Sequence, residues 1–174
     1  MYKFAAASEQ ESIVFGSARP GYQDEAVQAW IEFMKAQGIQ RICCLLPESQ
    51  LSRYRDLIGT YQQQFNAVCW SPIEDFRLCD RINLIQEILP FLAEADQGNE
   101  KVLVHCSGGI GRTGHVLAAW LVYGRGLSPQ AAIAAVKKTG RNPREAGIAA
   151  LFFGRNPLRV MRDLNALLDS VRSK

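Results

Sequence analysis

A strand that runs into a glycine-rich loop and then into a helix is the feature that most constrains the fold of this chain. The segment reads Val102-Leu103-Val104-His105-Cys106-Ser107-Gly108-Gly109-Ile110-Gly111-Arg112-Thr113-Gly114. Its apolar start predicts a buried strand, and a strand followed directly by a helix is typical of α/β folds. The loop glycines lack side chains that would block the backbone N–H groups, which can therefore surround a tetrahedral anion. The positive N-terminal end of the helix points at the same place.

A cysteine and an arginine flank this loop. Backbone N–H groups and the helix dipole stabilise a thiolate, so we expect Cys106 to be a nucleophile at neutral pH. Arg112 can return to the rim of the loop, where its planar guanidinium binds two phosphate oxygens. A phosphate anion repels a thiolate unless its oxygens are neutralised, so the nucleophile and the anion cradle belong in one loop. The residues therefore predict attack of Cys106 at phosphorus.

Displacement at phosphorus also needs a proton for the departing oxygen, and a carboxylic acid on a neighbouring loop is the natural donor. The segment Ser71-Pro72-Ile73-Glu74-Asp75-Phe76 follows a predicted strand at 67–70. In a parallel sheet the carboxyl ends of the strands meet at one edge, which would place Asp75 beside Cys106. We choose Asp75 as the acid, and Asp80 further along the same segment remains the alternative.

Strand and helix patterns alternate along the rest of the chain. Apolar spacing predicts helices at 24–37, 51–63, 81–95, 114–123, 129–138, 145–152 and 158–171, and strands at 39–47, 67–70 and 102–105. Pro90 should bend the third helix or interrupt its hydrogen bonds. The order predicts an α/β fold with a central, mainly parallel sheet flanked by helices and a helical C-terminal half. We expect residues 1–174 to form a single domain.

Composition excludes several classes of protein. Hydrophobic residues make up 48% and charged residues 21% of the 174 residues, which is typical of a globular chain. The net charge of +3 is far from the basic surface that nucleic-acid binding needs. Five cysteines that form no CxxC pair, with only two histidines, predict neither a disulfide framework nor a metal site. No apolar run is long enough for a membrane helix and the first residues do not resemble a signal peptide, so we expect a cytoplasmic monomer.

Three motifs together resemble one known family. His105–Gly114 looks like the HCxxGxxR[ST]G signature of cysteine-dependent protein tyrosine phosphatases. Pro72–Asp75 is similar to the general-acid loop of their smaller, dual-specificity-like branch. Arg141–Ala146 resembles a loop that closes one wall of the family's site, although a surface role for its arginines explains the sequence equally well.

The resemblance implies a two-step reaction without metal or cofactor. Cys106 would form a phosphocysteine while Asp75 protonates the leaving group, and Asp75 would then act as a base toward water. Thr113 would help the thiolate to leave, and His105 would orient the loop from behind. The resemblance further implies two sets of contacts. Phosphate oxygens would be bound by Arg112 and by the backbone N–H groups of Ser107, Gly108, Gly109, Ile110 and Gly111, and the substrate wall would contain Arg141, Asn142 and Arg144.

The expected substrate is phosphotyrosine in a protein or peptide, together with phosphoserine or phosphothreonine. The loop holds no lysine, although phosphoinositide-directed relatives often carry basic residues there, and the chain shows no counterpart of the segment that deepens the pocket of large tyrosine-specific members. The alternatives are a phosphatase of a lipid, sugar, nucleotide or RNA end, and a phosphate-recognition module without turnover. A rhodanese-like sulfur transferase also uses a cysteine loop, but the glycines and the upstream aspartate suit phosphate better.

Overall fold

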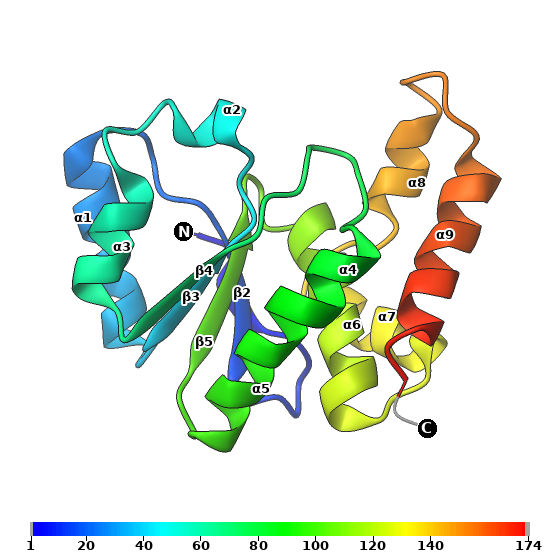
Figure 1. Ribbon diagram of the computed structural model, residues 1–174, viewed down its shortest axis with the longest axis horizontal. Coiled ribbons are helices and arrows are strands. Elements are labelled where there is room, and N and C mark those ends of the chain that lie inside the picture. Colours follow the sequence, from blue (N-terminus) through cyan, green and yellow to red (C-terminus); the bar gives the residue numbers. More distant parts are fainter. Residues whose placement is uncertain (1, 173–174) are drawn as a thin grey trace.

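A five-stranded sheet forms the centre of the protein in the computed structural model, which describes residues 2–172 (Figure 1). The spatial strand order is β1-β2-β5-β3-β4. The bounds are β1 (Ala5–Ala6), β2 (Val14–Ala18), β3 (Arg41–Cys44), β4 (Ala67–Trp70) and β5 (Val102–Cys106). Only β1 is antiparallel to its neighbour, and the pairs β2–β5, β5–β3 and β3–β4 are parallel. The predicted α/β class with a mainly parallel sheet is confirmed, whereas the prediction missed β1 and β2.

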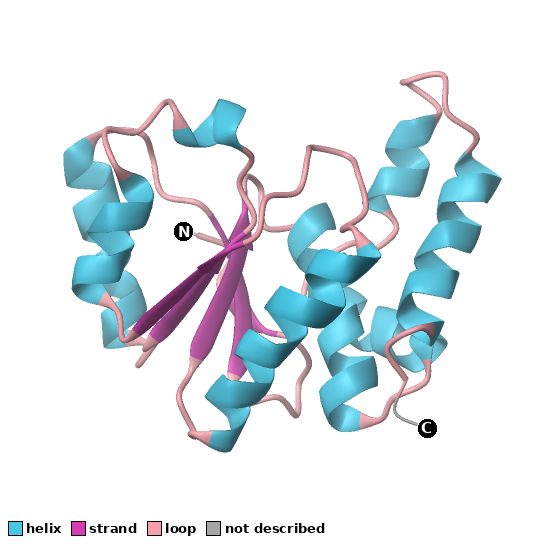
Figure 2. Cartoon of the chain, viewed as in Figure 1, coloured by secondary structure: helices cyan, strands magenta, loops and turns pink. Residues whose placement is uncertain are grey.

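Helices cover both faces of the sheet, and Figure 2 shows α1 and α3 on one face and most of the helical C-terminal half on the other. The bounds are α1 (Asp24–Ala36), α2 (Glu48–Leu51), α3 (Leu57–Gln64), α4 (Arg81–Asn83), η1 (Leu84–Ile88), α5 (Leu89–Gln97), α6 (Gly111–Arg125), α7 (Pro129–Lys138), α8 (Glu145–Ala150) and α9 (Pro157–Asp169). The single predicted domain also included residues 1, 173 and 174, which lie outside the described residues.

Two predicted helices differ from the structure for local reasons. The helix predicted at 51–63 is split, because the Asp56 side chain accepts a hydrogen bond from the Gly59 N–H at 2.9 Å and begins α3 anew. The helix predicted at 81–95 contains the π-helical segment η1 just before Pro90. Proline has no N–H and its ring crowds the carbonyl of the residue four positions earlier, so a local widening accommodates it. The interruption expected at Pro90 is thus present.

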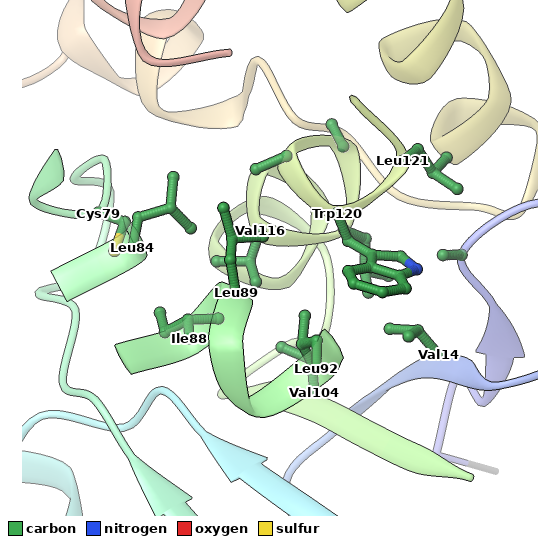
Figure 3. Close-up of a cluster of buried hydrophobic side chains, with 14 of the residues drawn as sticks. Val14, Cys79, Leu84, Ile88, Leu89, Leu92, Val104, Val116, Trp120 and Leu121 are labelled. Carbon is green, nitrogen blue, oxygen red and sulfur yellow. The ribbon is translucent and has the colours of Figure 1, made fainter. Parts of the chain in front are cut away.

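The strand and the helix on either side of the glycine-rich loop are both buried. Val102, Leu103 and Val104 of β5 have no exposed surface, and α6 is buried from Gly111 to Val122. Figure 3 shows Val104 of β5 with Val116 and Trp120 of α6 in the core, next to Leu89 and Leu92 of α5. Because both flanking elements are fixed by packing, the loop between them is held at a defined place at the carboxyl edge of the sheet.

Candidate active site

The glycine-rich loop from Cys106 to Gly111 packs tightly against the end of β2. Gly109 has a φ of 69°, and a Cβ atom there would lie 2.4 Å from the carbonyl carbon of Ser17, so only glycine fits. On the same side, the Arg19 N–H donates to the Cys106 carbonyl at 2.9 Å. The loop carbonyl of Ile110 accepts from the Gly114 N–H at 3.0 Å. Carbonyl groups of the loop therefore accept hydrogen bonds from the rest of the protein.

The backbone N–H groups of the loop, in contrast, have no backbone acceptors in the part of the chain that the structure describes. Within residues 2–172, no backbone N–H from Ser107 to Thr113 donates to a backbone carbonyl. The helix that follows, α6, runs from Gly111 to Arg125 and has no side-chain hydrogen bond capping its N-terminus. A run of donors at the positive end of a long helix is suited to binding an anion. The loop therefore has backbone donors of the kind that a phosphate cradle requires.

Arg112 brings the predicted acid to this loop. Its side chain is buried, and one guanidinium nitrogen, Nη1, donates to the Ile73 carbonyl at 3.0 Å. The other, Nη2, lies 3.2 Å from the Asp75 carboxylate. Both nitrogens also lie 3.4 Å from the side-chain oxygen of Gln50. Asp75 is half exposed and thus accessible to a substrate.

The rival acid, Asp80, has a structural role. Its Oδ1 atom accepts hydrogen bonds from the N–H groups of Ile82 at 2.8 Å and Asn83 at 3.3 Å, which caps the start of α4. N-cap side chains of this kind stabilise the first turn of a helix. The structure therefore favours Asp75 over Asp80 at the site.

His105 and Thr113 lie buried on either side of Cys106 in the chain. The His105 ring has no exposed surface and packs edge-on against Trp30 and Tyr61, with ring centroids 5.4 Å and 5.6 Å away. Burial lowers the pKa of His105 to about 3, so the ring is neutral at pH 7. The Thr113 hydroxyl is also buried and has no hydrogen-bond partner within residues 2–172. Both side chains are therefore placed to support the glycine-rich loop from inside the protein.

Of the two arginines predicted for the substrate wall, only one lies at the protein surface. Arg141 is buried, and its guanidinium donates to the carbonyls of Lys3 at 2.9 Å and Thr139 at 3.0 Å and also to the Gly16 carbonyl. Arg141 therefore ties the N-terminal strands to the end of α7, and the expectation that it contacts substrate is wrong, because the guanidinium faces backbone oxygens. Arg144, in contrast, is exposed.

Asn142 links the wall to the phosphate loop. Its N–H donates to the Ile110 carbonyl at 3.4 Å, and its side-chain oxygen accepts from the Arg144 N–H at 3.2 Å. These contacts hold the turn that precedes α8 against the glycine-rich loop. Asn142 and Arg144 thus lie at the border of the candidate site.

Sequence reasoning missed several residues at the site, among them Gln50 beside Arg112. Glu145, the first residue of α8, lies over Gly111, where a Cβ atom would be 1.8 Å from the Glu145 carboxylate. Burial, together with the charge of Asp75, raises the pKa of Glu145. Arg19 donates to the Ser107 hydroxyl at 3.4 Å and to the Tyr54 hydroxyl at 3.0 Å. Glu145 lies within a motif that the sequence analysis identified, whereas nothing near Arg19 in the sequence indicates its position.

This fold and this site together define a cysteine-dependent phosphatase. The family model described as "Dual specificity phosphatase, catalytic domain" matches residues 22–147, and the chain belongs to this family. A curated relative, cyclin-dependent kinase inhibitor 3 of Rattus norvegicus, is 35% identical over 148 residues, which cover 83% of this chain and 68% of the relative. A shorter match, 37% over 51 residues, is to the dual specificity protein phosphatase OPG106 of Vaccinia virus, and it covers 29% of this chain and 30% of the viral protein.

Solved structures agree with this assignment. Tk-PTP in its active form has a TM-score of 0.68 and 25% identity, covering 90% of this chain and 93% of its own. Kinase associated phosphatase with its catalytic cysteine replaced by serine has a TM-score of 0.71 and 24% identity, covering 95% of this chain and 96% of its own, and shares the fold. The protein is therefore a protein phosphatase of the tyrosine and dual-specificity kind, and the alternative of a non-protein phosphomonoester substrate is not favoured.

Proposed function

We propose that the protein hydrolyses phosphotyrosine, and also phosphoserine and phosphothreonine, in protein substrates through a phosphocysteine on Cys106. The observation that carries the proposal is the position of Cys106 at the end of β5, directly before backbone N–H groups that donate to no backbone carbonyl within residues 2–172. Such donors stabilise both a thiolate and the oxygens of a transferring phosphoryl group.

The first step transfers the phosphoryl group to sulfur. The Cys106 thiolate attacks phosphorus, the bond between phosphorus and the ester oxygen breaks, and that oxygen takes the proton from the Asp75 carboxyl group. Arg112 binds two of the phosphoryl oxygens in this step, exchanging its present contacts with Asp75 and the Ile73 carbonyl for the substrate. The ion pair with Asp75 supports this assignment because it brings the acid next to the phosphate-binding arginine.

The second step releases phosphate. Water attacks phosphorus while the Asp75 carboxylate accepts its proton, and the bond between sulfur and phosphorus breaks to return the Cys106 thiolate. The Thr113 hydroxyl, buried one residue after Arg112, stabilises the departing thiolate. His105 remains neutral and supports the loop from behind. The residues named here account for the chemistry without a cofactor.

The proposal also covers the substrate, the cellular compartment and the oligomeric state. We assign a phosphorylated protein as partner, with Asn142 and Arg144 at the edge of its binding site and no part for nucleic acid or a membrane. Among residues 2–172, no helix combines the length and the apolar character that crossing a membrane would require. We propose a cytoplasmic monomer in which residues 1–174 act as a single phosphatase domain.

The test is phosphate release from p-nitrophenyl phosphate and from phosphotyrosine, phosphoserine and phosphothreonine peptides, with EDTA present. Turnover that persists in EDTA and is absent in Cys106→Ser supports the proposal. Rapid denaturation of the enzyme during turnover should trap phosphate on Cys106 as a phosphocysteine, detectable by mass spectrometry. Turnover that survives in Cys106→Ser, or that EDTA abolishes, would overturn the mechanism.

A further inference from the structure

The segment that contains the general acid is a loop whose position depends on contacts from elsewhere in the fold. Between β4 and α4, residues 71–80 form no helix or strand. Asp75 is held by Arg112, but in the proposed reaction Arg112 turns to the substrate phosphate. At that moment the acid has to stay in reach of the leaving oxygen, since proton transfer requires hydrogen-bond distance. Other contacts must therefore keep the segment in place.

One such contact joins the acid segment, residues 71–80, to the loop between α8 and α9. That loop is at the upper right of Figure 1. The Arg155 guanidinium donates from Nη2 to the Phe76 carbonyl at 2.8 Å. The Phe153 ring lies against the Phe76 ring with centroids 5.4 Å apart and planes tilted by 32°. Arg155 and Phe153 thus hold both the backbone and the side chain of the residue that directly follows Asp75.

The backbone at Phe76 shows why this contact matters. Phe76 has a φ of 55°, a left-handed conformation that costs a residue with a side chain about 1 to 2 kcal/mol. Its N–H donates to the Asp75 side chain at 3.2 Å, so this conformation also sets where the Asp75 carboxylate points. A conformation of this cost persists only where surrounding contacts hold it. The contacts from Arg155 and Phe153 act on this residue.

A second contact joins the far end of the acid segment to the phosphate loop. His115 of α6 is buried, and its Nε2 atom accepts a hydrogen bond from the Cys79 N–H at 3.0 Å. Because Nε2 accepts, the ring proton is on Nδ1, which donates to the Gly111 carbonyl at 3.1 Å. The ring therefore connects the acid segment at Cys79 with the end of the phosphate loop at Gly111.

We propose that Arg155 and His115 are positioning residues that hold Asp75 in place for proton transfer while Arg112 binds the substrate phosphate. The inference rests on the proposed function, because it takes Asp75 as the general acid. It adds that proton delivery depends on the loop between α8 and α9, which makes no direct contact with the phosphate in the proposed reaction. Loss of either contact should slow protonation of the leaving group without changing the phosphate cradle.

The experiment compares two aryl phosphates that differ in their need for an acid. p-Nitrophenolate leaves readily without a proton, whereas phenolate needs one, so a misplaced acid slows phenyl phosphate selectively. We expect Arg155→Ala to lower kcat for phenyl phosphate about tenfold and for p-nitrophenyl phosphate less than about twofold, with KM unchanged. Arg155→Lys, which keeps a donor, should recover part of the loss.

Matched variants separate the possible outcomes. Arg159→Ala removes an exposed arginine in the first turn of α9 whose side chain makes no hydrogen bond within residues 2–172, and it should behave as the unaltered protein. Asp75→Asn should show the same selective loss as Arg155→Ala, but larger. If Asp75→Asn shows the selectivity and Arg155→Ala matches Arg159→Ala, the positioning role is wrong and the proposed function stands. If Asp75→Asn itself shows no selectivity, the acid assignment and the positioning role both fail.

His115 is tested in the same way, with folding measured beside activity. His115→Gln can supply an acceptor and a donor on one side chain, whereas His115→Phe supplies neither. We expect the selective loss for phenyl phosphate in His115→Phe and partial recovery in His115→Gln. Equal losses for both aryl phosphates in a variant that melts as the unaltered protein does would contradict the role of His115. Should His115→Phe fail to fold, the Arg155 series decides the proposal.

Discussion

The Arg112 guanidinium lies 3.2 Å from the Asp75 carboxylate, although Asp75 lies in the loop before α4 and Arg112 in the first turn of α6, with α4, η1, α5 and β5 between them in the chain. Parallel strands bring the ends of β4 and β5 to the same edge of the sheet, with β3 between them. The ion pair therefore connects the proposed general acid and the proposed phosphate-binding group before substrate arrives. In the proposed reaction, substrate phosphate replaces Asp75 as the partner of Arg112, which frees the Asp75 carboxyl group to act on the leaving oxygen.

Asp75→Asn should separate substrates by their leaving groups, because the amide keeps the shape of the side chain but has no acidic proton. We expect kcat for phenyl phosphate to fall by about 10²-fold or more, and kcat for p-nitrophenyl phosphate to fall far less. Steady-state rates as a function of pH check the role, since the variant should lose the part of the profile that depends on a protonated acid.

Asp80→Asn is the matched control for this assignment. Asparagine caps a helix about as well as aspartate, so the contacts with the Ile82 and Asn83 N–H groups survive, and neither rate nor stability should change. An Asp80→Asn enzyme with the leaving-group selectivity expected of Asp75→Asn would move the acid role to Asp80.

Arg112→Lys should impair both binding and rate. Lysine places a single ammonium where the guanidinium offers two parallel donors, so it cannot bind two phosphoryl oxygens at once. We expect kcat/KM for phosphopeptides to fall by about 10²-fold or more, with weaker competition by inorganic phosphate. Full inhibition by phosphate in an inactive Arg112→Lys variant would show that another group binds the anion.

The sequence predicted the site better than it predicted its surroundings. Cys106, Arg112 and Asp75 could be placed because the glycine-rich loop and the parallel strand order constrain them strongly. Strand β2 was missed, since Gly16, Ser17 and Ala18 have little strand preference of their own and are extended by pairing with β5.

Contacts between distant segments explain the remaining differences. The buried position of Arg141 depends on carbonyls near the N-terminus, and the contact of Arg155 with Phe76 joins residues 79 positions apart in the chain. The sequence shows no periodicity or motif that predicts either contact, because each arginine donates to a backbone carbonyl, which any residue could supply. By contrast, the start of α7 at Pro129 followed from Ser128 and Pro129, whose effects are local.

Two buried histidines should make the protein less stable in mild acid. Burial lowers the pKa of His115 from its ordinary value of 6.5 to about 4 and that of His105 to about 3. Between pH 6.5 and 5 the unfolded chain therefore binds protons that the folded protein does not, and the free energy of unfolding falls as pH falls. The expected loss over this range is about 1 to 2 kcal/mol per histidine.

Urea unfolding at several pH values measures this effect. Burial alone would raise the pKa values of Glu11 and Asp96, but the contacts of both carboxyl groups with Arg125 lower them overall. The contribution of these two groups to stability is therefore lost only at lower pH. Over the range from pH 6.5 to 5 the raised pKa of Glu145 acts in the opposite direction, so the contribution of His115 is read from the comparison with His115→Gln. In His115→Gln the slope of stability against pH should become shallower, whatever the stability of that variant at pH 7.5. An unchanged slope would mean that His115 does not stay neutral in the folded protein.

Arg141→Met should reduce stability and leave catalysis intact. The change keeps much of the apolar stem but leaves the carbonyls of Lys3 and Thr139 without their donor, and a buried acceptor that loses a charged partner costs about 1 to 3 kcal/mol. We expect the free energy of unfolding to fall by about 2 to 4 kcal/mol, with kcat and KM unchanged well below the melting temperature. The exposed neighbour Arg144→Ala provides the contrast, since it should leave stability unchanged and raise KM for phosphopeptides. A higher KM in Arg141→Met at full stability would return Arg141 to the substrate wall.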